Sequence, residues 1–236
     1  MTLTNQKLVI IGGSSGIGLA TAIQAASLGA HIVIASRSAE RLRDAKKQIS
    51  GEVESFCLDV SDEEQVKEFF PKIGPFDHLI TSGSFSAPGT FPDTESARKS
   101  FDSKFWGQYY AAKHGVPHMR TGGSIVLFSG VLSHRPVAGT AIMTSINSAV
   151  EGLGRALAVD LAPLRVNVLS AGYIDTPRFA KLTESEKQTV LSGLTKQLPL
   201  QRMGTAKEAA QAVLYLVTNT YVTGTALYVD GGYALR

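Results

Sequence analysis

The sequence has almost no cysteine, no long apolar run and no signal-peptide pattern. Cys57 is the only cysteine among 236 residues, so no internal disulfide can form, which favours a reducing compartment. No apolar run approaches the roughly 20 residues that a membrane-spanning helix needs. Residues 1–7 are polar and lack the basic and apolar regions of a signal peptide. We therefore expect a cytoplasmic protein with no membrane partner.

Charge of one sign is nowhere concentrated. The formal net charge is +3 and the pI is near 8.9, yet no run of five or more like charges occurs. This scatter argues against a nucleic-acid partner. The chain is 44% hydrophobic and 18% charged, which is ordinary globular composition. Its length suits one α/β domain over residues 1–236 and is short for two. No metal site is expected.

Short apolar runs alternate with helix-periodic segments along the chain. Seven runs are predicted to be strands, because they are short and most are rich in β-branched residues. They cover residues 8–11, 31–35, 53–58, 78–81, 124–128, 165–169 and 226–229. Several are apolar almost throughout, which is typical of parallel strands covered by helices on both faces.

The segments between these runs carry helix signals. Residues 16–28 are rich in small side chains and stop at Gly29, a natural C-terminal cap. Apolar residues between Ile142 and Leu161 fall on one helical stripe, and Pro163 follows its end. The alternation predicts an α/β fold, a doubly wound (Rossmann) parallel sheet of about seven strands in a single domain. Residues 176–223 contain no predicted strand, and the polar part at 176–199 is predicted to be a substrate lid.

A glycine cluster directly follows the first predicted strand and opens the first predicted helix. Glycines at such a turn allow the backbone to approach a pyrophosphate, which then lies at the positive end of the helix. The predicted phosphate-binding residues are Gly12, Ser14, Ser15, Gly16, Ile17 and Gly18. A glycine cluster alone also fits a flexible turn, but its place between a strand and a helix favours dinucleotide binding.

The end of the second predicted strand indicates which dinucleotide is bound. An acidic residue there would bond the ribose 2′-hydroxyl of NAD, but this chain has Ser36, Arg37 and Ser38 instead. A guanidinium pairs with a 2′-phosphate, and serine hydroxyls donate to it. The alternative is that Arg37 is a solvated loop residue. We predict NADP(H) as the cofactor.

The glycine spacing is G-x-x-x-G-x-G, and here the chain resembles the short-chain dehydrogenase/reductase family, in its shorter-subunit branch. The resemblance covers nearly the whole chain. It implies that Asp59 and Val60 contact the adenine, that Ser82 and Gly83 lie at the cofactor, and that Ile174 and Thr176 belong to the loop on its nicotinamide side. Residues 202–204 and 223–232 match the C-terminal motifs of the family.

The four catalytic positions of the family are all substituted. The motif that normally carries Tyr and Lys, spaced Y-x-x-x-K, has Met143 and Asn147. The usual Ser aligns with Gly130, one residue after Ser129, and the usual Asn aligns with Lys104. By resemblance, Gly130, Met143 and Tyr173 are predicted to line the substrate pocket, and Lys104, Asn147 and Ser129 are the candidate catalytic residues.

Two of these substitutions are reciprocal. Asn147 replaces the family lysine, while Lys104 replaces the family asparagine, and in the family fold these positions lie near each other under the nicotinamide. We predict that Lys104 takes over the cationic role, contacting the cofactor together with Asn147 and acting as a possible proton donor. The alternative is a surface lysine in a salt bridge.

The missing hydroxyls leave the proton donor open. Without Tyr and Ser, the developing alkoxide of a ketone loses its usual donors, a penalty of several kcal/mol. Nearby replacements are Ser129, Ser133, Thr144, Ser145, Tyr173 and His134, each of which also fits a packing or loop role. An acceptor that needs little acid assistance, such as a quinone or an activated carbonyl, is therefore favoured over a simple ketone.

Three functions remain in competition. The first is an NADP(H)-dependent oxidoreductase acting on a small molecule with an atypical active site. The second is a catalytically inactive NADP(H)-binding regulator or partner subunit, and the third, a purely structural protein, leaves the glycine loop and Arg37 without a purpose. The resemblance further implies a homodimer or homotetramer.

Overall fold

A seven-stranded parallel sheet forms the centre of the molecule. The structure is a computed structural model and describes residues 2–83, 91–177, 192–193, 196 and 198–235. The strand order is β3-β2-β1-β4-β5-β6-β9. The strands are β1 (Lys7–Ile11), β2 (His31–Ser36), β3 (Val53–Cys57), β4 (Phe76–Thr81), β5 (Met119–Gly130), β6 (Arg165–Ala171) and β9 (Ala226–Val229). The predicted doubly wound α/β sheet in a single domain is confirmed.

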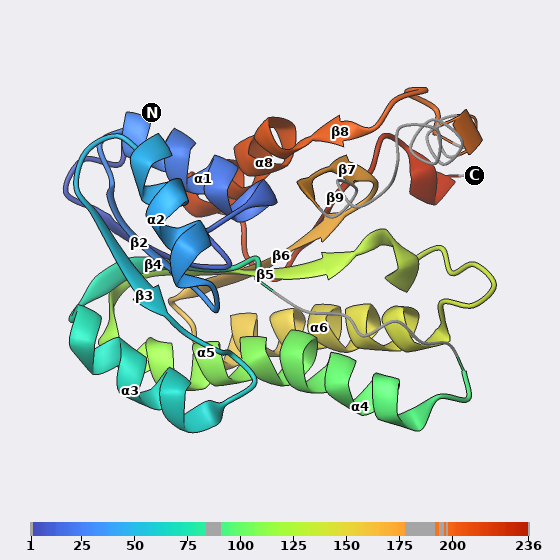
Figure 1. Ribbon diagram of the computed structural model, residues 1–236, viewed down its shortest axis with the longest axis horizontal. Helices are drawn as coiled ribbons and strands as arrows, with labels where there is room; N and C mark the ends of the chain where they lie inside the picture. Colours follow the sequence, from blue (N-terminus) through green and yellow to red (C-terminus); the bar gives the residue numbers. More distant parts are fainter. Residues whose placement is uncertain (1, 84–90, 178–191, 194–195, 197, 236) are drawn as a thin grey trace.

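Helices cover both faces of this sheet (Figure 1). On one side lie α1 (Gly16–Ser27), α2 (Ala39–Gln48) and α8 (Ala206–Thr218). On the other side lie α3 (Glu63–Ile73), α4 (Thr94–Phe101), α5 (Gly107–Gly115) and α6 (Ala141–Asp160). A π-helical segment, Asp102–Trp106, joins α4 to α5.

The two faces of the sheet explain why its strands are apolar throughout. In β1, Leu8 and Ile10 belong to the apolar cluster under α1 and α8, while Val9 and Ile11 belong to the cluster under α3, α5 and α6. Successive side chains of a strand point to opposite faces, so a sheet covered on both sides has no solvent-facing set.

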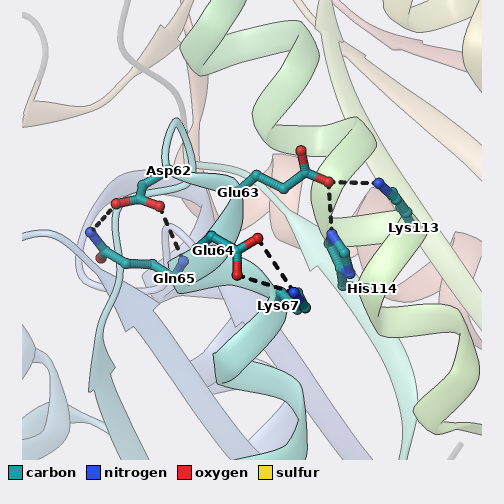
Figure 2. A network of polar contacts seen from close by, with 7 residues as sticks. All are labelled: Asp62, Glu63, Glu64, Gln65, Lys67, Lys113 and His114. Atoms are coloured by element: carbon teal, nitrogen blue, oxygen red, sulfur yellow. Dashed lines mark hydrogen bonds and ion pairs between the residues drawn. The ribbon is translucent and has the colours of Figure 1, made fainter.

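A polar contact fastens α3 to α5 at the edge of one helical layer (Figure 2). The Oε1 atom of Glu63 accepts hydrogen bonds from Lys113 Nζ at 2.7 Å and from His114 Nε2 at 2.9 Å. The bond from Lys113 is the main reason that the pKa of Glu63 lies below its usual value. The same turn begins with Asp62, whose Oδ1 accepts from the backbone N–H of Gln65 as an N-terminal cap.

The strand order reverses direction at β1, which has β2 on one side and β4 on the other. At such a point the connections leave the sheet on opposite faces, and a crevice opens at the carboxyl ends of the strands. The residues following β1, β2, β4 and β5 meet at this edge, and these include most of the predicted site residues.

Strands β7 (Ile174–Asp175) and β8 (Gly204–Thr205) were not predicted. They pair with each other, and β8 lies within residues 176–223, which were expected to contain no strand. Two residues are too few to produce a hydrophobic pattern. The lid predicted at residues 176–199 lies mostly outside the described residues. No helix in the described part of the chain is long and apolar enough to cross a membrane.

Candidate active site

The glycine loop between β1 and α1 packs against the end of β4 at distances that only glycine permits. A Cβ on Gly12 would lie 2.2 Å from the backbone nitrogen of Gly83, and one on Gly18 would lie 2.3 Å from both the carbonyl oxygen of Gly12 and Ser82 Oγ. Gly83 also donates its N–H to the carbonyl of Ile11. The predicted residues Ser82 and Gly83, which follow β4, therefore pack against the glycine loop and hold it in place.

The outer side of the same loop has more room. Gly16, at φ +54°, has its nearest neighbour, Thr176 Cγ2, 3.4 Å from its Cβ position. Ser15 begins α1 without a side-chain cap, and the first turn of the helix has no acidic residue. The first N–H groups of α1 thus face a position suited to an anion. Thr176 borders this position, and Ile174 anchors its segment in the interior at 6% exposure.

Polar groups gather where β2 ends. Among the described residues, Ser36 Oγ is buried without a hydrogen-bond partner. Ser38 Oγ accepts from the N–H of Arg41 as the cap of α2, and its own hydroxyl proton can still be donated. A buried hydroxyl with no partner costs free energy, so Ser36 suits a ligand acceptor such as a phosphate oxygen.

Arg37 lines a cavity of about 320 Å³ beside these serines. The other lining residues are Ser61, Lys99, Asp102 and Ser103. Arg37 offers this cavity a guanidinium that suits an anionic group, while the Lys99 ammonium pairs with Glu95 on α4.

The residues that follow β3 form the next wall of the crevice. Asp59 Oδ1 accepts from the N–H of Ser61 at 3.0 Å and from its hydroxyl at 2.7 Å, which fixes the turn. Val60 is buried against Gly107, where a Cβ would lie 2.7 Å from Val60 Cγ2. This close packing holds the start of α5 against the predicted adenine-side residues.

Lys104 is a buried lysine in the π-helical segment. Only 8% of it is exposed, so the expectation of a surface lysine does not describe its position. Its carbonyl accepts from Gln108 Nε2 at 2.7 Å, and the same nitrogen donates to the carbonyl of Phe128 at 3.0 Å. Gln108 thus fastens the Lys104 turn to β5, two residues before Gly130. Sequence reasoning missed both Gln108 and the π-helical turn, a feature frequent at functional sites.

Asn147 lies on α6, which packs against β5, β6 and the π-helical segment. It is 1% exposed, and its Oδ1 has no hydrogen-bond partner among the described residues. Its Nδ2 lies 3.1 Å from the Cβ position of Gly130, the last residue of β5. Met143 is half-buried one turn earlier on the same helix. The structure thus brings three of the aligned positions, 130, 143 and 147, to one place.

Two of the candidate hydroxyls, those of Ser129 and Ser133, face Glu151. Ser129 Oγ donates to Glu151 Oε1 at 2.8 Å, and Ser133 Oγ reaches the same oxygen at 2.6 Å. Tyr228 donates to Glu151 Oε2 at 3.4 Å, and the His134 ring packs against Tyr228. Glu151 is buried one turn beyond Asn147 on α6 and was missed in the sequence, although its spacing from Asn147 places it on the same helix face.

Tyr173 is a poor acid in this environment. Its ring packs edge-on against the buried Tyr233 at a centroid distance of 5.2 Å. Burial raises the pKa of Tyr173 to about 12, so its phenol stays protonated at neutral pH. Thr144 lies 3.3 Å from the hydroxyl of Thr140. No group of metal-ligating side chains occurs in the part of the chain that the structure describes.

The fold and the glycine loop define a doubly wound α/β protein with a dinucleotide-type phosphate loop. The family model described as "Enoyl-(Acyl carrier protein) reductase" matches residues 12–234. The chain therefore belongs to the short-chain dehydrogenase/reductase family. The short-chain dehydrogenase/reductase ucsE of Acremonium sp is 31% identical, over 98% of this chain and 96% of the relative. The 3-oxoacyl-[acyl-carrier-protein] reductase FabG of Thermotoga maritima is 30% identical, over 98% and 99%.

Solved structures agree with this assignment. A small-chain dehydrogenase in complex with NADPH is 36% identical, with a TM-score of 0.84, over 98% of this chain and 99% of that chain. YwfH, an NADPH-dependent reductase involved in bacilysin biosynthesis, is 26% identical with a TM-score of 0.89, over 98% of both chains. The similarity to these relatives thus covers nearly the whole of each chain.

Proposed function

We propose that this protein is an NADPH-dependent reductase of a carbonyl or quinone-like acceptor, with catalytic groups that differ from those usual in its family. The observation that carries the proposal is the burial of Lys104 and Asn147 at the edge of the sheet that bears the glycine loop. A lysine is seldom buried, and a buried amide oxygen such as Asn147 Oδ1, which has no hydrogen-bond partner among the described residues, is costly, so their position beside a cofactor-type crevice favours a functional role. The similar reductases named above support the same reaction class.

The cofactor fits the polar groups that the crevice presents. The uncapped start of α1 suits the pyrophosphate, and the unpartnered Ser36 hydroxyl with Arg37 suits the 2′-phosphate. The NADPH complex of a 36% identical relative supports this choice. Asp59, Val60, Ile174 and Thr176 complete the predicted contacts. When bound, NADPH supplies a hydride to the acceptor.

The side chains of the protein then have distinct tasks. The Lys104 ammonium is proposed to hold the nicotinamide ribose and to neutralise charge that develops on the acceptor oxygen. Met143, Gly130 and Tyr173 are proposed to line the acceptor pocket. Ser129 already donates its only hydroxyl proton to Glu151, so we propose that it positions α6 through Glu151 and does not touch the acceptor.

A second candidate function is that of a catalytically inactive NADP(H)-binding regulator or partner subunit. It is favoured by the engagement of Ser129 and Ser133 with Glu151 and by the high pKa of Tyr173, which together leave few acidic hydroxyls for the acceptor. In either case we propose a homodimer or homotetramer, as the family resemblance implies.

The deciding experiment follows NADPH oxidation by the purified protein with quinones, aldehydes and ketones. We expect turnover with at least one class and a loss of about 100-fold in kcat/KM for Lys104→Ala, the size expected for a lost electrostatic group. Lys67→Ala, at an exposed lysine on α3, is the matched control and should retain full activity. Tight NADPH binding without any turnover would favour the regulator, and an unaffected Lys104→Ala variant would remove Lys104 from the mechanism.

A further inference from the structure

Gly130 is a glycine for reasons of space and not of backbone conformation. Its φ is −167° and its ψ is 152°, an extended conformation that any residue adopts. A Cβ at this position would lie 3.1 Å from Asn147 Nδ2, tighter than most Cβ contacts, and 3.5 Å from the carbonyl oxygen of Ala171. The absent side chain therefore lets the Asn147 amide lie close against the carboxyl end of β5.

The other end of the same amide has no partner. Asn147 Oδ1 is buried without a hydrogen bond in the part of the chain that the structure describes. A buried amide oxygen is costly to leave unpaired, whereas an apolar residue of the same size would carry no such cost. The orphaned acceptor therefore indicates a ligand that brings a hydroxyl or N–H donor.

The neighbouring side chains do not compete for this amide. The hydroxyls of Ser129 and Ser133 both point to Glu151, one turn further along α6. Position 130 itself contributes no side chain. At the end of β5, the Asn147 amide is thus the buried neutral donor beside the predicted substrate position.

We propose that the Asn147 amide bridges the two ligands of this site. Nδ2, beside Gly130, donates to the carbonyl oxygen of the acceptor, and Oδ1 accepts from a ribose hydroxyl of the nucleotide cofactor. This inference deepens the proposed function and rests on it for the identity of both ligands. An amide polarises a carbonyl but surrenders no proton near neutral pH. The bound cofactor would supply the hydride to the carbonyl carbon, and Lys104 would give a proton to the oxygen and would be reprotonated by water.

Glycine variants separate the two ends of the amide. Gly130→Ala adds a Cβ that meets the Nδ2 side of the amide first, at 3.1 Å, and Oδ1 is not among its three nearest atoms, so we expect kcat to fall at least tenfold while the Kd of NADPH stays within twofold. The matched control is Gly152→Ala on α6, where the nearest side-chain atom to an added Cβ is Arg155 Nη2 at 4.0 Å. Unchanged kcat in Gly130→Ala would overturn the proposal.

Asn147→Leu removes both hydrogen-bonding groups at similar volume. We expect NADPH to bind about tenfold more weakly and kcat to fall about 100-fold, while the Tm of the free protein is equal to or above that of the wild type. A purely structural amide would give the opposite pattern, a lower Tm with unchanged NADPH affinity.

An NMR measurement tests the bridge without turnover. The chain has four asparagines, Asn5, Asn147, Asn167 and Asn219, so ¹⁵N-asparagine labelling yields four side-chain NH₂ signals. We expect NADP⁺ to shift the Asn147 signals and isatin, an activated carbonyl compound added to the NADP⁺ complex, to shift them again. Asn167, whose Nδ2 is bonded to the carbonyl of Val222, serves as the buried internal control.

The outcomes distinguish this inference from the proposed function. An inactive wild type whose Asn147 signals respond to both additions would refute the reductase and support the bridge. Signals that respond to NADP⁺ alone, or to neither addition, would overturn the bridge whether or not the protein turns over.

Discussion

His78 is buried in β4 between two polar partners. Its Nδ1 lies 2.8 Å from Ser124 Oγ and its Nε2 lies 3.0 Å from Gln6 Oε1. An amide oxygen only accepts, so Nε2 carries the proton and Nδ1 accepts from the serine. This neutral tautomer satisfies both contacts, whereas a second ring proton would face a hydroxyl that already donates. Burial, and to a smaller degree the charge of Arg165, lowers the pKa of His78 to about 4, although Asp77 opposes this.

The lowered pKa of His78 predicts a loss of stability in acid. The unfolded chain takes up this proton near pH 6.5 and the folded chain only near pH 4, so the stabilisation is complete above pH 6.5 and is lost as the pH falls towards 4. We expect the free energy of unfolding to drop by up to about 3 kcal/mol over this window. Urea denaturation between pH 4 and 7 measures it.

The control for this pH dependence is a histidine on the surface. His78→Gln should flatten the curve between pH 4 and 6.5, whereas His31→Gln, at an exposed position, should retain the wild-type slope. Equal slopes in both variants would assign the acid sensitivity to other groups.

At the scale of elements, Gln108 joins a helix to two strands. Strand β4 pairs with β5 only as far as Ile80 and Val126, so the backbone of Phe128 lies beyond the reach of β4. Gln108 Oε1 accepts from the N–H of Phe128 at 2.7 Å, and its Nε2 donates to the carbonyl of the same residue. The Gln108 side chain thus bonds the Phe128 backbone where β4 no longer pairs with β5, and it holds the Lys104 turn at the same time.

Loss of this clamp predicts a defect in both stability and catalysis. Gln108→Ala leaves buried backbone groups of β5 unpaired, and we expect the free energy of unfolding to fall by about 3 kcal/mol. If the enzyme is active, kcat should fall as well, because Lys104 loses its anchor. Chemical denaturation measures the first effect, with Gln48→Ala at an exposed position of α2 as the control. A variant as stable as the control would contradict the clamp.

At the scale of the whole molecule, cofactor binding draws on segments far apart in the sequence. The glycine loop, the end of β2 and Thr176 all meet at the carboxyl edge of the sheet, so a bound nucleotide would tie both halves of the sheet together. A ligand that binds only the folded state stabilises it by mass action.

The rise in Tm on addition of NADPH or NADH therefore reports which of the two cofactors the folded protein binds more tightly. NADPH at 100 times its Kd should stabilise the protein by about 2.7 kcal/mol, and a chain of this size should gain about 5–10 °C in Tm. NADH at the same concentration should give a clearly smaller shift. Arg37→Ala should reduce the NADPH shift by about half and leave the NADH shift unchanged, because only the 2′-phosphate contact is lost.

Arg43→Ala, which removes an equal charge from an exposed position on α2, should behave as the wild type. Equal shifts with NADH and NADPH in the wild-type protein would contradict the assignment of Ser36, Arg37 and Ser38 to the 2′-phosphate.

Local patterns alone predicted most of the architecture. The seven strands and the helices at 16–28 and 142–161 follow from apolar runs and helical periodicity, because burial on one or two faces produces a regular pattern in the sequence. The short pair β7 and β8 left no such trace. The glycine loop was predictable as well, since its residues are neighbours in the chain and their spacing alone defines the turn.

The arrangement of the site was decided by tertiary structure. The family motifs indicated that Lys104 replaces the usual asparagine and that Asn147 replaces the usual lysine. Only the packing of α6 and of the π-helical turn shows that both side chains are buried. The contact between Gly130 and Asn147, the engagement of Ser129 by Glu151 and the clamp of Gln108 join residues 17 to 22 positions apart. The sequence by itself determined the fold and the loop because their signals are local. The tertiary structure decided which polar groups face a ligand, because hydrogen-bond partners are set by the packing of helices on the sheet.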